Sequence, residues 1–143
     1  MADTNVLVDA AHHRSVHHDA CRQLIEAWQA DGARWFVTWG ICFEFLRIVT
    51  HPAIYRSPWS AAEGWRFLEG LFATGTNVLG HAEDFPSHVE ELFKEQSQLA
   101  GNIMHDAHTA ILMREHGLRR IYTRDTDFHR FPFIEPIDPL RPS

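Results

Sequence analysis

The chain has 143 residues, of which 45% are hydrophobic and 22% are charged, and its formal net charge is -6 at pH 7. This length and apolar content are typical of a single folded domain with a core, and they exclude an intrinsically disordered chain. The acidic balance argues against broad electrostatic binding of nucleic acid, which needs a basic surface. An acidic protein can still act on a polyanion where metal ions mediate the contact.

Other classes are excluded by the pattern of apolar residues. No stretch approaches the roughly 18 apolar residues that span a bilayer, and no basic-then-apolar leader precedes the first aspartate. The two cysteines, Cys21 and Cys42, lie in apolar stretches, so we expect small buried side chains and no disulfide. We therefore expect one domain over residues 1–143, located in the cytoplasm and without a membrane anchor.

Extended and helical segments alternate in the first half of the chain. We expect Asp3 at the carboxyl end of a first strand, just before the apolar run that follows it. Residues 15–32 carry apolar side chains four positions apart and predict a helix, which Ser15 caps and Gly32 ends. The next predicted elements are a buried strand over residues 34–39 and a helix over residues 40–51.

The alternation continues in the second half. The predicted elements are a helix over residues 60–75, a strand over 76–80, helices over 84–101 and 102–117, a strand over 118–125 and an edge strand over 133–140. Pro86 fits the first turn of its helix, and Pro136 limits the last strand to an edge. Strands separated by helices predict an α/β fold with a mainly parallel sheet, whose site lies beyond the carboxyl ends of the strands.

Acidic residues stand inside or beside apolar runs at the ends of these elements. They are Asp3, Glu44, Asp106, Asp125 and Asp127. If they converge, like charges a few ångströms apart cannot all stay ionised without a cation. A set of carboxylate oxygens suits Mg²⁺ or Mn²⁺, and such a site can activate water for displacement at phosphorus. The acids therefore predict nuclease chemistry without a nucleophilic side chain.

Each acid alone also has a structural explanation. Asp3 could cap a short helix, and Asp106 could be a first-turn acid favoured by the helix dipole. Asp125 and Asp127 could close an Asx turn. Glu44 is the hardest to explain in this way, because it lies in mid-helix between two phenylalanines. The joint pattern of the acids therefore counts for more than any one of them.

Four stretches, in this order, resemble the PIN-domain ribonucleases, and among them the VapC-like toxins of bacterial toxin–antitoxin modules: DTNVLV, EFLRIVTHP, GNIMHDAHTAILMREHG and YTRDTDFHRFP. The resemblance covers nearly the whole chain. It implies a three-layer α/β/α sandwich with a mainly parallel central sheet. It further implies an endoribonuclease that depends on Mg²⁺ or Mn²⁺, forms a homodimer and is neutralised by a cognate antitoxin protein.

The resemblance also implies roles for individual residues. The metal-binding, catalytic carboxylates would be Asp3, Glu44, Asp106 and Asp125. Asp127 matches the second acid of the last motif and would bind metal more weakly, while Asn5 and Thr123 would orient the carboxylates. Among the basic residues, Arg124 and Arg14 are candidate contacts to the RNA backbone. Only two residues precede Asp3, so we expect a very short first strand, or a start site that is misplaced or truncated.

Several interpretations remain open. The histidines of HHRSVHH could bind a transition metal, although a solvated loop and helix start explains them more simply. His105 and His108, in HDAH, are expected at the rim of the site or in packing. Two alternative functions are a PIN nuclease of RNA maturation and a PIN fold that has lost activity and binds RNA or protein.

Overall fold

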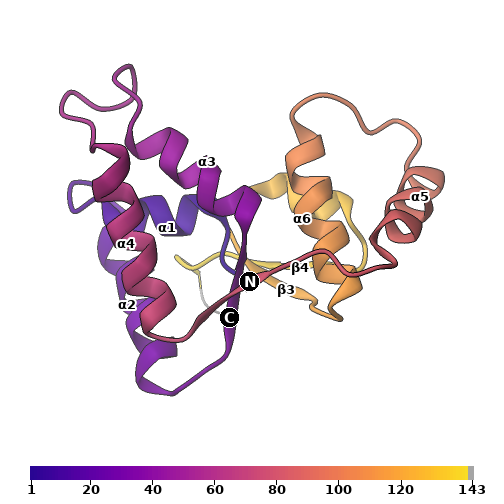
Figure 1. Ribbon diagram of the computed structural model, residues 1–143, viewed down its shortest axis with the longest axis horizontal. Helices are drawn as coiled ribbons and strands as arrows, with labels where there is room; N and C mark the ends of the chain where they lie inside the picture. The colour runs from indigo at the N-terminus through magenta and orange to yellow at the C-terminus, as the bar shows by residue number, and fades with distance from the viewer. Residues whose placement is uncertain (142–143) are drawn as a thin grey trace.

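The computed structural model describes residues 1–141 and has an α/β architecture (Figure 1). One set of helices gathers on one side of the strands: α1 (Thr4–Ala11), α2 (His18–Ala30), α3 (Trp39–Val49) and α4 (Ala61–Ala73). The other side carries α5 (Phe85–Glu95) and α6 (Ile103–Glu115). The strands are β1 (Trp35–Thr38), β2 (Thr76–Leu79), β3 (Arg120–Tyr122) and β4 (Glu135–Ile137), and a 3₁₀ helix, η1, covers Thr126–Arg130.

All strand pairs in the described residues are parallel, as expected from the alternation of elements. β1 pairs with β2, and β3 pairs with β4. The first two residues connect these pairs: the Ala2 amide donates to the Phe36 carbonyl at 2.9 Å, and the Tyr122 amide donates to the Met1 carbonyl at 2.9 Å. Ala2 also forms a parallel bridge with Tyr122. The expected first strand is therefore present, but it is only a short link between β1 and β3.

Local sequence explains where several helices begin. The Thr38 hydroxyl accepts a hydrogen bond from the Ile41 amide and caps α3 at the end of β1. Ser60 and Glu63 form a reciprocal capping box at the start of α4. Pro86 lies in the first turn of α5, as predicted. These caps place the helices close to where the sequence pattern put them.

Three boundaries differ from the prediction. Asp3 does end the first strand, but it also caps a helix, α1. The apolar pattern of these residues fits a strand as well as a helix, so it did not predict α1. Ser15 does not cap α2, which begins three residues later, because the Ser15 hydroxyl donates to Asp9 of α1. The helix predicted over residues 84–101 ends at Glu95, and the polar stretch after it is a turn.

The core lies where the helices meet the strands. Its largest fully buried side chains include Phe45, Phe128, Phe131, Leu7 and Leu68. Both cysteines are buried and free, as expected from their apolar surroundings. Within residues 1–141, no helix is long and apolar enough to cross a membrane. This core fixes the positions of the helices and strand ends that carry the acidic residues.

Candidate active site

Asp3 lies at the point where the first strand turns into α1. Its side chain is 8% exposed, and its carboxylate accepts three hydrogen bonds. The donors are the Thr4 amide at 2.7 Å, the Asn5 side-chain amide at 2.7 Å and the Thr123 hydroxyl at 2.6 Å. Asp3 is thus a helix cap and a buried carboxylate of the cavity at the same time.

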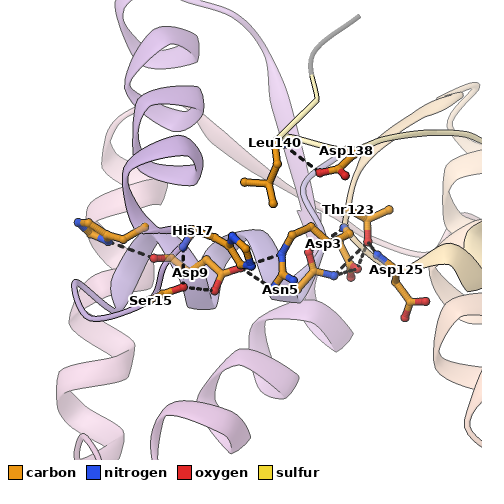
Figure 2. A network of polar contacts seen from close by, with 11 residues as sticks. Asp3, Asn5, Asp9, Ser15, His17, Thr123, Asp125, Asp138 and Leu140 are labelled. Atoms are coloured by element: carbon orange, nitrogen blue, oxygen red, sulfur yellow. Dashed lines mark hydrogen bonds and ion pairs between the residues drawn. The ribbon is translucent and has the colours of Figure 1, made fainter.

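Thr123 and Asn5 connect Asp3 to the loop after β3 (Figure 2). The Asn5 side-chain amide also donates to the Thr123 hydroxyl at 3.0 Å, and that hydroxyl accepts a hydrogen bond from the Asp125 amide at 2.9 Å. The Asn5 carbonyl oxygen accepts from the Arg124 amide at 3.1 Å. These contacts hold the first and last acidic motifs together.

Three carboxylates form a tight group beside Asp3. Asp106 comes from the first turn of α6, Asp125 caps η1, and Asp127 lies in the first turn of η1. One oxygen from each of these three side chains lies within 4.8 Å of the others. The Asp127 amide donates to the Asp125 carboxylate at 2.8 Å, so the Asx turn considered from sequence is present and also shapes the group.

The pKa values of Asp106 and Asp3 are raised, which reflects burial and the repulsion between neighbouring carboxylates. Burial, followed by the charges of Asp125, Asp3 and Asp127, raises the pKa of Asp106 to about 7. Burial also raises the pKa of Asp3, although its hydrogen bonds to Thr123 and Thr4 oppose this. A divalent cation would remove the repulsion, and a donor set made only of carboxylate oxygens fits a hard ion such as Mg²⁺ or Mn²⁺.

Glu44 lies on α3 at the edge of the same cavity. Its carboxylate accepts hydrogen bonds from the Arg47 guanidinium at 2.9 and 2.7 Å. Hydrogen bonding to Arg47 lowers the pKa of Glu44, so this side chain stays charged. Glu44 is not part of the tight group of three carboxylates, although it lines the same cavity.

All five predicted acids line one cavity of about 580 Å³. Asn5 and Arg124 line it too, as do His105 and His108, which were expected at its rim or in packing. Arg14 does not line the cavity; it is exposed in the turn between α1 and α2. The fold therefore brings together nearly all of the predicted site residues from both ends of the chain.

The histidine-rich stretch does not form a metal site among the described residues. His12 stacks on Tyr55, and the His18 ring contacts the Asp9 carbonyl at 3.1 Å. Within residues 1–141, the one group of three or more candidate ligands consists of aspartates alone. His18 begins α2, so the simpler interpretation of a loop and a helix start agrees with the structure.

Comparison with known proteins identifies the family. A family model described as PIN domain matches residues 1–134. The chain belongs to the PIN-domain family. This PIN domain is 32% identical over 140 residues to Ribonuclease VapC48 of Mycobacterium tuberculosis, with 96% of the chain and 95% of the relative covered. The resemblance to VapC-like PIN-domain proteins is therefore confirmed.

Two solved structures share the fold. VapBC2 from Rickettsia felis, bound to a DNA fragment from its promoter, aligns with a TM-score of 0.67 and 16% identity, covering 96% of each chain. VapC20 of Mycobacterium tuberculosis, described as a Sarcin-Ricin loop cleaving toxin, aligns with a TM-score of 0.66 and 17% identity, covering 94% of this chain and 95% of the other. At these identities the likeness shows the fold of the PIN domain, and it confirms the predicted α/β class.

One ion pair of the cavity, Glu44 with Arg47, and one charged residue, Asp9, were missed at the sequence level. Arg47 lies one turn after Glu44, and this spacing could have indicated the ion pair. Asp9 follows the apolar run of α1 and is only 7% exposed. Its partner Arg124 is 115 residues away, so the sequence held no signal for that contact beyond an acid on an apolar helix.

Proposed function

We propose that this PIN domain is a metal-dependent endoribonuclease of the VapC type, the toxin of a toxin–antitoxin pair. The observation that carries the proposal is the convergence of Asp106, Asp125 and Asp127 within 4.8 Å beside the buried Asp3. Identity of 32% to a protein named as a ribonuclease supports the same activity. The substrate class that fits is RNA, cut within the chain at a phosphodiester bond.

Asp106, Asp125 and Asp127, together with Asp3, are the residues that would hold Mg²⁺ or Mn²⁺, with Glu44 completing the set from α3. A bound ion of this kind activates water and stabilises the charge that develops on the phosphorus oxygens. The side chains of this protein supply orientation: Thr123 and Asn5 hold the Asp3 carboxylate by hydrogen bonds of 2.6 and 2.7 Å. The expected products carry 5′-phosphate and 3′-hydroxyl ends.

The basic residues of the cavity would contact the RNA backbone. Arg47 lines the cavity beside Glu44 and is well exposed, so it can reach a phosphate group. Arg124, proposed from sequence for this role, also lines the cavity but is engaged by Asp9. Arg14, outside the cavity, would contact RNA only beyond the cleaved bond.

We further propose the partners that accompany such a toxin. One of the structural relatives is described as VapBC2 bound to a DNA fragment from its promoter, and the two-part name fits a toxin with its antitoxin. By analogy this PIN domain would act in the cytoplasm as a homodimer that a cognate antitoxin neutralises. An open reading frame for a small protein immediately upstream, whose product co-purifies with the chain, would support this assignment over RNA maturation.

The activity is tested by incubating purified protein with a mixed RNA pool in Mg²⁺, in Mn²⁺ and in EDTA. Asp106→Asn removes one charge from the acid group, and Asp31→Asn removes one from an exposed position at the end of α2 and serves as the control. We expect cleavage with either metal, none in EDTA or with Asp106→Asn, and full cleavage with Asp31→Asn. Sequencing of the product ends would identify the cut sites.

The opposite result has a defined meaning. If the wild-type protein leaves the pool intact in both metals while it still binds RNA, the protein is a binding module and the nuclease proposal is wrong. If cleavage persists in EDTA, the acid group is not the reaction centre.

A further inference from the structure

Arg124 occupies an exceptional position in this cavity. It stands between Thr123 and Asp125 in sequence and lines the cavity with the acid group. Yet its guanidinium is engaged elsewhere: both Nε and Nη2 donate to the same oxygen of Asp9, at 3.0 and 2.6 Å. Asp9 comes from α1, so this ion pair connects α1 to the loop that carries Asp125.

Asp9 is itself held in place. Its second carboxylate oxygen accepts a hydrogen bond from the Ser15 hydroxyl at 2.7 Å (Figure 2). Its side chain is 9% exposed, and the side chain of Arg124 is 32% exposed. A buried carboxylate persists only where donors satisfy it, and here Arg124 and Ser15 satisfy both oxygens. The position of the guanidinium is therefore determined by a fixed partner and is not left to solvent.

Without Asp9, Arg124 would have other partners. The carboxylates of the acid group line the same cavity as Arg124, and a guanidinium pairs strongly with a carboxylate in a partly buried site. Such a pair would occupy the oxygens that a divalent cation needs, because the guanidinium and the metal ion both bind the negatively charged carboxylate oxygens. We propose that Asp9 is a positioning residue that holds the Arg124 guanidinium away from the acid group and keeps those carboxylates open for metal.

This inference rests on the proposed metal-dependent function, and it makes a distinctive prediction. Loss of Asp9 alone releases the guanidinium, so metal binding weakens. Loss of Arg124 as well removes the competitor, so metal binding returns. If Asp9 only supports the fold, the double variant should bind Mn²⁺ no more tightly than Asp9→Asn alone, because removing Arg124 as well restores none of the lost contacts.

The test measures Mn²⁺ affinity by isothermal titration calorimetry and by the electron paramagnetic resonance of free Mn²⁺, without RNA. The proteins are wild type, Asp9→Asn, Arg124→Gln and the double variant, with near-ultraviolet circular dichroism in EDTA to verify folding. We expect Asp9→Asn to bind Mn²⁺ about tenfold more weakly. We expect the double variant to return to within about threefold of wild type.

A second measurement uses the wild-type protein and so does not depend on whether Asp9→Asn folds. In the metal-free wild-type protein, the Nε–H resonance of Arg124, assigned by its loss in Arg124→Gln, should be protected from solvent exchange and should stay in place when Mg²⁺ is added. A resonance that becomes protected only when Mg²⁺ is added would overturn the inference. It would mean that the guanidinium is not held by Asp9 in the metal-free protein and moves to Asp9 only when the metal binds.

The two proposals fail in different ways. If wild type binds Mn²⁺ and Asp9→Asn binds it equally well, or if the double variant is as weak as Asp9→Asn, the role of Asp9 is wrong and the proposed function stands. If wild type itself binds no Mn²⁺, the metal-dependent function is wrong and the inference falls with it.

Discussion

The Thr123 hydroxyl donates a 2.6 Å hydrogen bond to the Asp3 carboxylate, joining two residues that are 120 positions apart. The same hydroxyl accepts from the Asp125 amide, so one small side chain orients two carboxylates. We expect Thr123→Val to lower kcat/KM for RNA by about 10- to 100-fold, because Asp3 loses a donor while the shape is kept. Mn²⁺ affinity and cleavage of a defined RNA would measure the loss.

Thr123→Ser is the matched control, because it keeps the hydroxyl and removes only a methyl group. It should retain most of the activity. Equal losses in Thr123→Val and Thr123→Ser would show that packing at this buried position, and not the hydrogen bond, supports the site.

The raised pKa of Asp106 makes the stability of the metal-free protein depend on pH. The pKa of this carboxyl in the folded state is about 7, against an ordinary value of 3.8, so the folded state binds the proton more tightly. Stability from this group is fully present below pH 4, is lost as pH rises through 7 and stays lost above it. The loss amounts to about 1 kcal/mol, since the carboxyl is partly exposed and solvent screens it.

We therefore expect Asp106→Asn, in EDTA, to melt about 3 to 5 °C above wild type at pH 8 and close to wild type at pH 4. With Mg²⁺ at pH 8, wild type should instead melt at a higher temperature than Asp106→Asn, because Mg²⁺ stabilises only the protein with the intact acid group. Differential scanning fluorimetry at both pH values measures this. An Asp106→Asn effect of the same size at both pH values would contradict the assigned pKa.

Glu44 and Arg47 form an exposed ion pair at the edge of the cavity, and such pairs contribute little to folding. We expect Glu44→Gln to change the free energy of unfolding by less than about 1 kcal/mol. Cleavage should still fall about tenfold, through weaker metal binding. The exposed Arg22–Glu26 pair on α2 provides the control: Glu26→Gln should alter neither quantity. Unchanged cleavage with Glu44→Gln would remove Glu44 from the site.

Close packing of α4 on α3 fixes the helix that carries Glu44. A Cβ at Gly64 would lie 2.7 Å from the Leu46 side chain and 3.2 Å from Val49, whereas one at Gly70, on the same helix, would meet nothing within 4 Å. We expect Gly64→Ala to cost about 1 kcal/mol in urea unfolding, because crowding exceeds the gain in helix propensity. Gly70→Ala should add about 0.5 to 1 kcal/mol. Stabilisation by both would show that α3 and α4 can separate without cost.

Much of the fold was predictable because its signals are local. The strand at Trp35–Thr38, the cap at Ser60 and the proline at the start of α5 depend on residues within one turn of each other. The start of α1 was considered only as an alternative, since the same apolar run fits a strand or a helix and the Asp3 cap distinguishes the two. The end of α5 was wrong because the polar residues after Glu95 could have continued a helix.

The site was predictable as a set of residues but not as a geometry. Asp106, Asp125 and Asp127 were found from their positions at element ends and from the family resemblance, and they converge. Their separation from Glu44 depends on how α3 packs, whereas the engagement of Glu44 by Arg47, one turn later on the same helix, could be inferred from the spacing. The pairing of Asp9 with Arg124 depends on a tertiary contact, which no local pattern specifies.

The contact of Met1 and Ala2 with β3 has a consequence for folding during synthesis. These residues lie against β3, and Thr123, at its end, is made 120 residues after Asp3. At about 5–20 residues per second, the ribosome takes several seconds to reach that point. Every shorter nascent chain has Asp3 but no Asp125 or Asp127 to place beside it. The cell would therefore contain an assembled acid group only when synthesis of the chain is nearly complete, which is also when an antitoxin could bind the finished fold.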